Sequence, residues 1–469
     1  MHGMGKVRRG GVVASTMVLL LLAASNWPAG GFAEVRADGS AAATTADSDY
    51  GKDRVQDLQP LIDRTPSGGT LTLERGRVYA GPATIDKPIT LASAGQSTLT
   101  NPGDEPALVL KADGIVIRDL IIRDSGTDPK KPSVLVQSDR NRIEGIDLVT
   151  QGGGIYLREA NDNELRNNRI QGAGAGKRSE AFSKRGNGID LFGSSRNVIE
   201  GNTIIHVHDG IYVESSNETR VSGNTAIDSR YGFHFMFSGK PELVDNVGEG
   251  NVTGGMVMGV EGAVVEGNRF DKQTENVNSQ GILLYDVHNS RIDRNRVEGN
   301  RVGVYIENST GNSLADNEVS RNFIGMQMIG ASGNAFKDSV FAANVIQAQA
   351  TESDDNTLSG NYWDDFGGLD ENGDGFSELR YEIDPFFLQA TEDIDAFQIF
   401  FQSPGLPFLA EVFRTDTSKW LKDLKPRIEP PSWYEEPGGS EGRGTTLRLG
   451  LALLAASAMT IYRWGYRKS

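Results

Sequence analysis

Apolar and polar residues alternate through the middle of this chain, and the alternation returns at a fixed interval. The segments Gly188-Ile-Asp-Leu, Gly210-Ile-Tyr-Val and Gly232-Phe-His-Phe each begin 22 residues after the one before. Alternation with a period of two is typical of β-strands, and a repeat of this length is typical of a solenoid. The pattern therefore predicts an all-β fold, a right-handed parallel β-helix of about eleven or twelve coils between Leu71 and Asn361.

Two positions in each repeat are apolar in almost every coil, and two others are not. The first and third residues after each repeated Gly are apolar, so we expect them to point into the coil. The second and fourth then point outward, where a partner or ligand would meet them. They read Asp190, Tyr212, His234, Met256, Leu283, Tyr305 and Gln327 at the second position, and Phe192, Glu214, Met236, Met258, Tyr285, Glu307 and Ile329 at the fourth.

An asparagine keeps the same interval as the glycines. Side-chain amides that repeat at one turn can hydrogen-bond to one another, so we expect them to stack as a ladder. The ladder residues are Asn202, Asn224, Asn246, Asn295 and Asn317. A short helix over Val55–Asp63 is expected to cap the first coil, because the open end of a solenoid needs cover.

Two insertions interrupt the repeat, one between Asn168 and Gly188 and one between Asn268 and Gly281. The first is rich in Gly and carries four basic residues, Lys177, Arg178, Lys184 and Arg185. Insertions on one side of a solenoid often form its binding face.

The sequence outside the repeat predicts further parts. Basic residues precede an apolar run from Val12 to Ala24, which is typical of a secretory signal peptide. A second apolar run, followed by Arg463, Arg467 and Lys468, predicts a single membrane helix with its basic end in the cytoplasm. The expected order is signal peptide 1–33, spacer 34–54, parallel β-helix 55–384, hydrophobic Pro- and Phe-rich strap 385–436, linker 437–446 and membrane helix 447–463.

Composition narrows the compartment and the partners. The chain has no Cys among its 469 residues, which excludes disulfides and thiolate metal sites. Its formal net charge of −16 argues against a nucleic-acid partner. Together with the signal and membrane segments, this predicts an exported protein anchored to the outer face of the cytoplasmic membrane.

Four soft or borderline metal ligands lie close together in the outward columns. Strands of neighbouring coils are about 4.8 Å apart, so we expect His234 beside Met256 and Met236 beside Met258. Imidazole and thioether ligands favour Cu(I) over Mg²⁺ or Ca²⁺. The same four residues could instead form an apolar contact surface for a partner. The residue types leave both interpretations open.

The remaining histidines carry less signal. His206 and His208 are two residues apart on another side of the coil, so we interpret them as turn residues. His288 also lies at a turn.

A second candidate metal site follows the last coil. Oxygen ligands alternate there with a Gly at the bend, as in a calcium loop, at Asp370, Asn372, Asp374 and Glu378. Tyr381 stands where the full pattern has a bidentate Glu. The alternative is a hydrogen-bonded turn that caps the last coil.

An enzymatic interpretation is weaker. The segment Tyr231-Gly-Phe-His234-Phe-Met236 is similar to the Tyr-Gly-Phe-Asp-Pro-His signature of alginate C5-epimerases. The two catalytic positions of that signature carry His234 and Met236 here, and a thioether cannot act as a general acid or base. Asp190 is the lone carboxylate of its column, whereas glycoside hydrolysis uses a pair. We therefore expect a protein that is not an enzyme.

From about Val55 to Pro431 the chain resembles NosD-type proteins, the β-helical maturation factors of nitrous oxide reductase. The likeness is carried by Arg230-Tyr-Gly-Phe-His-Phe-Met-Phe-Ser238, by Gly254-Gly-Met-Val-Met258 and by Asn361-Tyr-Trp-Asp-Asp365. It implies a non-catalytic exported protein that supports copper delivery to the copper–sulfur centre of the reductase. Its implied partners are an ABC-type ATPase and permease, a copper-donor lipoprotein and the reductase itself. The C-terminal membrane helix departs from many relatives, which are soluble in the periplasm.

Two functions therefore remain for the outward face. The first is an assembly factor that handles copper transiently, with calcium as a structural ion only. The second is a polysaccharide-binding or polysaccharide-modifying β-helix. A patch of soft ligands favours the first, whereas an acidic and aromatic sugar groove would favour the second.

Overall fold

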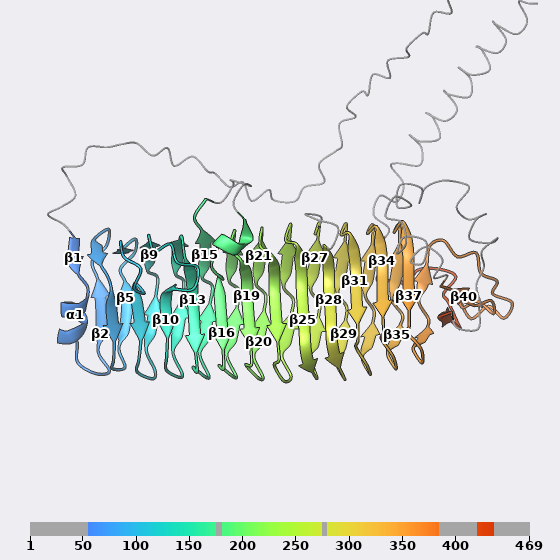
Figure 1. The fold of residues 1–469 in the computed structure, drawn as a ribbon, viewed down its shortest axis with the longest axis horizontal. Coiled ribbons are helices and arrows are strands. Elements are labelled where there is room, and N and C mark those ends of the chain that lie inside the picture. Colours follow the sequence, from blue (N-terminus) through green and yellow to red (C-terminus); the bar gives the residue numbers. More distant parts are fainter. Residues whose placement is uncertain (1–54, 175–180, 274–278, 384–419, 436–469) are drawn as a thin grey trace, which may run out of the picture. The chain divides into compact units, whose positions relative to one another are not determined.

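The described residues form a parallel β-solenoid, as the repeat predicts (Figure 1). The computed structural model describes residues 55–174, 181–273, 279–383 and 420–435. The expected signal peptide, spacer, linker and membrane helix lie outside these residues, as does most of the strap. Among the described helices, none is long and apolar enough to cross a membrane.

Within the described residues the strands form three sheets, and each coil contributes one strand to each sheet in turn. The 14-stranded sheet contains β1 (Val55–Asp57), β3 (Val78–Ala80), β6 (Thr98–Asn101), β9 (Ile121–Asp124), β12 (Asp147–Thr150), β15 (Arg169–Gly172), β18 (Thr203–Ile205), β21 (Thr225–Ile227), β24 (Val247–Glu249), β27 (Arg269–Asp271), β30 (Arg296–Glu298), β33 (Glu318–Ser320), β36 (Val340–Ala342) and β39 (Tyr362–Trp363).

The 12-stranded sheet, which carries the two outward columns, contains β4 (Ala83–Ile85), β7 (Leu108–Leu110), β10 (Pro132–Val136), β13 (Gly153–Arg158), β16 (Ile189–Phe192), β19 (Asp209–Glu214), β22 (Tyr231–Met236), β25 (Thr253–Glu261), β28 (Gln280–His288), β31 (Val302–Glu307), β34 (Ile324–Ile329) and β37 (Ile346–Thr351).

The 15-stranded sheet contains β2 (Thr70–Leu73), β5 (Thr90–Ser93), β8 (Val116–Arg118), β11 (Arg142–Glu144), β14 (Glu164–Arg166), β17 (Val198–Glu200), β20 (Arg220–Ser222), β23 (Glu242–Val244), β26 (Val264–Glu266), β29 (Arg291–Asp293), β32 (Ser313–Ala315), β35 (Ala335–Lys337), β38 (Thr357–Ser359), β41 (Lys422–Asp423) and β40 (Tyr381–Glu382).

The described solenoid has about 14 coils, more than the eleven or twelve expected from the repeat. The early coils lack the repeated Gly that made the later ones easy to count. They also differ in length, as the strand register shows: Leu71 pairs with Leu91, and Leu91 pairs with Ile117. Turns of unequal length absorb the difference while the strands stay in register.

The repeated Gly is required by a close approach between coils. A Cβ built on Gly210 would lie 2.4 Å from the carbonyl oxygen of Gly232, and one on Gly232 would lie 2.7 Å from that of Gly254. No side chain fits at such distances. The glycine period in the sequence therefore records the stacking of one coil on the next.

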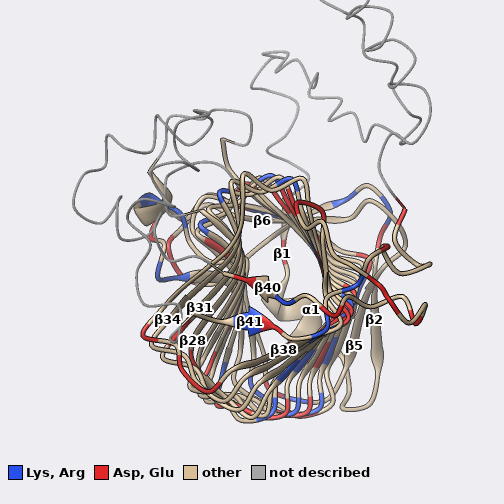
Figure 2. Ribbon diagram, turned by 90° about the vertical axis from the view of Figure 1, so that its right-hand side faces the viewer, with Lys and Arg blue, Asp and Glu red and all other residues tan. Residues whose placement is uncertain are grey.

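The inward columns form the core as predicted. Ile211, Phe233 and Leu284 have no exposed surface, and Leu191 and Ile306 are equally buried. Each such side chain stabilises the fold by about 1.5–3 kcal/mol relative to an exposed one. Viewed along the axis, the strands of successive coils lie one behind another around this core (Figure 2).

The expected asparagine ladder is also present. The side chain of Asn202 donates to Asn224 at 2.9 Å, and Asn224 donates to Asn246 at 3.0 Å. Asn268 continues the ladder and joins Asn246 to Asn295, so the insertion at this point does not break it. All of these side chains are buried, and their amides satisfy turn backbone groups that water cannot reach.

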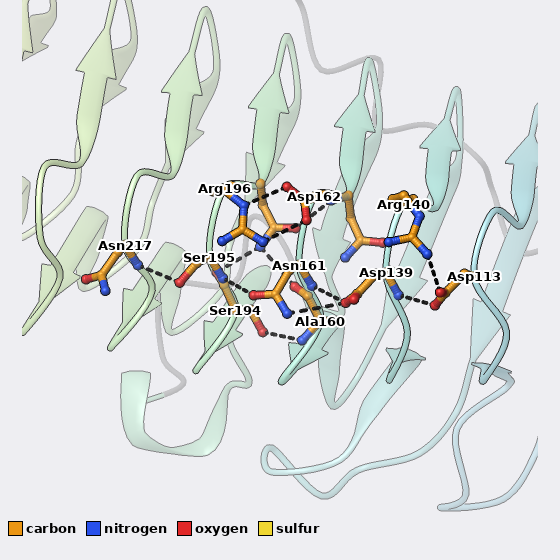
Figure 3. A network of polar contacts seen from close by, with 12 residues as sticks. Asp113, Asp139, Arg140, Ala160, Asn161, Asp162, Ser194, Ser195, Arg196 and Asn217 are labelled. Atoms are coloured by element: carbon orange, nitrogen blue, oxygen red, sulfur yellow. Dashed lines mark hydrogen bonds and ion pairs between the residues drawn. The ribbon is translucent and has the colours of Figure 1, made fainter.

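A second polar ladder crosses the turns that link the 12-stranded and 15-stranded sheets (Figure 3). Asn161 N–H donates to Asp139 at 2.7 Å, and the side-chain Oδ1 of Asn161 accepts from Ser195 N–H at 2.9 Å. Arg196 then forms a two-point ion pair with Asp162, with both distances 2.8 Å. Polar contacts thus hold successive turns in the same way as the buried asparagines do.

Both ends of the described solenoid are covered (Figure 2). Helix α1 (Gln59–Arg64), with the residue before it, caps the first coil through buried Leu58 and Ile62. The helix is shorter than the expected range Val55–Asp63 and shifted along the chain, because Val55–Asp57 forms strand β1 instead. At the other end β41, which belongs to the predicted strap, pairs with β38 and β40. The buried carboxylate of Asp423 there accepts hydrogen bonds from Asn361 and Trp363. The described part of the strap therefore packs on the solenoid.

Candidate functional site

The predicted pairing of the four soft ligands is present on the outer face of the 12-stranded sheet. His234 of β22 lies in register with Met256 of β25, and Met236 lies in register with Met258. Because the two strands are adjacent and parallel, same-column side chains are direct neighbours. The three methionine side chains are half-buried.

His234 is more enclosed than its outward column suggests, since only 4% of its surface is exposed. The rings of Tyr212 and Tyr231 flank the imidazole, each with its centroid 4.8 Å away. The expectation of an open surface position is therefore corrected for this residue. An outward direction does not ensure exposure where large neighbours cover the sheet.

Asp209 fixes the orientation of His234. Its carboxylate is 1% exposed, and its Oδ2 lies 2.9 Å from Nδ1 of His234. Arg230 forms a two-point ion pair with the same carboxylate at 2.8 and 2.6 Å. Burial alone would raise the pKa of Asp209, but the bonds from His234 and Arg230 outweigh it and lower the pKa to about 2.

This arrangement selects one tautomer of the imidazole. An ionised carboxylate only accepts hydrogen bonds, so Nδ1 of His234 must carry the proton that it donates to Asp209. In neutral His234 the other nitrogen, Nε2, then has a free lone pair. Nε2 is buried and has no hydrogen-bond partner among the described residues. A buried nitrogen without a partner is rare and needs an explanation, of which a bound ligand is one. Nε2 of His206 shares this property, but no methionine lies in register beside that residue.

One of the neighbouring sulfur atoms also has a polar contact. The hydroxyl of Tyr212 lies 3.4 Å from Sδ of Met236 and 2.6 Å from a carboxylate oxygen of Glu214. Burial and the bond to Glu214 raise the pKa of Tyr212, so its hydroxyl keeps its proton. The patch thus offers neutral donor atoms, one nitrogen and up to three sulfurs. The side chains of His, Asp and Glu in the described residues nowhere gather in threes that could hold a metal.

Two other histidines are placed differently from each other. Nδ1 of His206 lies 2.5 Å from Asp228, as befits a buried turn residue. His208 lines a cavity on the outer face of the 12-stranded sheet together with Asp190, so its interpretation as a mere turn residue is incomplete. Burial lowers the pKa of His208, which favours the neutral ring.

The candidate calcium ligands bind the backbone of their own turn. The carboxylate of Asp370 accepts from Gly373 N–H at 2.6 Å and from Gly375 N–H at 2.9 Å. Asn372 and Asp374 accept from backbone N–H groups two residues further on, and Glu378 accepts from Glu371 N–H at 2.9 Å. These bonds form the alternative turn that the sequence allowed. Calcium at this position stays a prediction.

Asp209 is the residue of the candidate site that the sequence did not point to. It stands immediately before the repeated Gly210, where the next coils carry Tyr231 and Thr253. A lone carboxylate in an otherwise uncharged column is the signal that could have identified it. Arg230 stands out in the sequence only as part of the motif shared with NosD-type proteins.

Comparison with known proteins agrees with these observations. Residues 176–368 match the family described as periplasmic copper-binding protein (NosD). A protein from Pseudomonas aeruginosa named "Probable ABC transporter binding protein NosD" is 28% identical over 161 residues, which are 34% of this chain. The match spans 36% of that relative, about a third of its length.

The solved structures that are similar to this chain share little sequence with it. The A-module of the mannuronan C-5 epimerase AlgE6 from Azotobacter vinelandii has 16% identity and a TM-score of 0.46, covering 65% of this chain and 88% of its own. The family 28 exopolygalacturonase from Yersinia enterocolitica has 9% identity and a TM-score of 0.47, covering 65% and 78%. The part of the chain that is similar to the NosD family, residues 176–368, contains His234 and the three methionines of the patch.

Proposed function

We propose that this protein is a non-enzymatic assembly factor that holds Cu(I) in transit to the copper centre of nitrous oxide reductase. The observation that carries the proposal is the free, buried Nε2 of His234, whose ring is fixed by Asp209 and whose strand lies in register with the methionines of β25. The family description as a copper-binding protein supports the same metal.

The chemistry of the donor set suits Cu(I). Thioether sulfur and neutral imidazole are soft or borderline ligands, and they need not lose a proton when a monovalent ion binds. Nε2 of His234 would bind the metal, and the Asp209 carboxylate would bind the other ring nitrogen, Nδ1. A carboxylate at that position fixes the orientation of the ring and raises the basicity of the metal-binding nitrogen. Thioethers bind less tightly than thiolates, and this chain has no Cys. A site of this kind favours transfer over storage.

The geometry around Asp190 supports a role outside catalysis. Its carboxylate forms an ion pair with Arg158 at 2.7 Å and accepts from the Asn187 side chain at 2.7 Å. Both oxygens are therefore engaged, and its register neighbour on β19 is Tyr212 rather than a second carboxylate. Glycoside hydrolysis by a carboxylate pair finds no support in this column.

The partners belong to the same proposal. The P. aeruginosa relative is named as an ABC transporter binding protein, which agrees with an ABC-type permease and ATPase as partners. A copper-donor lipoprotein would load the patch and the reductase would receive the metal. The C-terminal segment 447–463 would hold the solenoid at the outer face of the cytoplasmic membrane.

A matched pair of variants tests the function in cells. In the test variant, His234→Gln is combined with Met236→Leu, Met256→Leu and Met258→Leu. These changes keep side-chain volume and leave Gln able to donate to Asp209. The control is Gln327→Ala with Ile329→Ala, which changes the same two columns on β34.

We expect the test variant to be produced normally but to yield reductase without its copper–sulfur centre. The control variant should yield fully loaded reductase. If reductase from cells with the test variant carries its full copper content, the metal does not pass through this patch.

A further inference from the structure

A cavity of about 310 Å³ is hollowed into the outer face of the 12-stranded sheet, on the coils before the methionine patch. Tyr156, Arg158 and Asp190 line it from β13 and β16. The segment 129–130 forms one wall, and residues 183–187 of the predicted binding-face insertion form another.

The polar lining of this cavity is fixed by its own hydrogen bonds. The Tyr156 hydroxyl donates to the Pro129 carbonyl at 2.9 Å and accepts from Asn187 N–H at 3.1 Å, so it ties the two walls together. Asp190, which is 7% exposed, is held by Arg158 and by the Asn187 side chain, each at 2.7 Å. A site whose groups are already positioned loses little entropy when a ligand binds.

Two cations at the cavity keep unused donors. Within the described part of the chain, all hydrogen bonds of the Arg158 guanidinium go through Nη1. About a third of the Arg158 side chain, 33%, is exposed, so the rest of its planar fork is open to a ligand. The exposed ammonium of Lys130 has no ion pair among the described residues. By contrast, Nη1 of Arg185 already lies 3.7 Å from Oδ1 of Asp228 in an ion pair.

The lining therefore calls for a ligand with both a negative group and hydroxyl groups. An open arginine fork is matched by a carboxylate, which it binds at two points. Asp190 can accept further hydrogen bonds but cannot donate any, so it favours a ligand with O–H donors beside its carboxylate. The volume suits one small ring rather than a polymer.

We propose that this cavity binds a small hydroxylated carboxylate, of the class of a single sugar acid. Its carboxylate pairs with Arg158 and Lys130, and its hydroxyls bond to Asp190 and Asn187. None of the side chains of the methionine patch lines this cavity, so the test of this proposal is independent of the function proposed above.

Calorimetric titration of the purified full-length protein tests the proposal with three probes. Galacturonate carries the carboxylate and the hydroxyls, glucose lacks the carboxylate, and inorganic phosphate lacks the ring hydroxyls. We expect saturable binding of galacturonate and at least tenfold weaker binding of the other two, because each lacks one of the matched groups. No saturable heat with galacturonate, or equal binding of glucose or phosphate, overturns the proposal.

Three variants locate the binding. Arg158→Lys keeps the charge beside Asp190 but removes the fork, and should weaken galacturonate binding about tenfold or more. Lys130→Ala removes an exposed charge and should weaken it about two- to fivefold. Arg142→Lys is the control, because Arg142 lies on the 15-stranded sheet and pairs with Glu144. If Arg158→Lys binds as tightly as the Arg142→Lys control while both show the parent's thermal unfolding, the cavity is not the site.

Discussion

At the scale of single residues, one carboxylate decides which nitrogen of His234 is available. Asp209 takes the proton-bearing Nδ1, and Nε2 is left without a hydrogen-bond partner among the described residues. Neither residue could do this alone, because a free imidazole exchanges between tautomers and a buried carboxylate without Arg230 would be costly to ionise.

Asp209→Asn tests this positioning role. An amide can accept or donate, so it no longer imposes one tautomer on His234. We expect nitrogen NMR of the imidazole to change from a single Nδ1-protonated form to a mixture, and Cu(I) affinity to fall about tenfold. If the NMR spectrum shows the same single tautomer as the parent protein, Asp209 is only a structural ion-pair partner of Arg230.

A different carboxylate makes stability depend on pH. Burial raises the pKa of Asp271 to about 6, with Arg269 opposing and Glu298 adding to the shift. Its folded pKa therefore exceeds the unfolded value of 3.8, so the folded state binds more protons between these two values. Stability must fall as pH rises through this window, and the loss is complete above about pH 6.

Asp271→Asn removes the titrating group and should remove that loss. We expect the variant and the parent to have similar unfolding free energies near pH 4. At pH 7.5 the variant should be more stable by about 1–2 kcal/mol, a figure reduced for the partial exposure of the site. Urea unfolding of both proteins at the two pH values measures the difference. An equal difference at both would show that ionisation of Asp271 is not its cause.

At the scale of structural elements, the ladders hold the turns in register. Asn224 accepts from Asn202 and donates to Asn246 and to the Ile199 carbonyl, all without exposure to water. Asn224→Ala leaves at least the Asn202 N–H buried without a partner, so we expect a loss of about 1–3 kcal/mol in unfolding free energy. Asn217→Ala, at an exposed turn, is the control and should cost clearly less. Similar losses in the two variants would mean that the ladder adds little beyond ordinary turn bonds.

These elements were predictable because residues that are one repeat apart in the sequence of a parallel solenoid are neighbours on adjacent coils. Asn202 and Asn224 touch since they are one coil apart, and the same holds for His234 and Met256. The coil number was underestimated because the first coils replace the period with unequal turns. The enclosure of His234 and its hydrogen bond to Asp209 could not be predicted from the repeat. The two residues are 25 positions apart rather than 22, and their contact depends on the directions of their side chains.

At the scale of the whole molecule, the features that could bind a ligand lie on one face of the described solenoid. The 12-stranded sheet carries the methionine patch, the cavity beside it and the walls that the insertion adds. The other faces are stabilised by ladders and by ion pairs between neighbouring strands, such as Arg123 of β9 with Asp147 of β12. A site built on strands is held more firmly than one on loops, which suits the proposed transfer of a metal.

The central claim is that Cu(I) binds at His234 and the adjacent methionines. X-ray absorption of the purified full-length protein loaded with one equivalent of Cu(I) tests it most directly. We predict a spectrum with one nitrogen and at least two sulfur ligands, and a weaker site without sulfur in the His234→Gln, Met236→Leu, Met256→Leu, Met258→Leu variant. A parent spectrum without sulfur ligands, or an unchanged spectrum in the variant, would contradict the account.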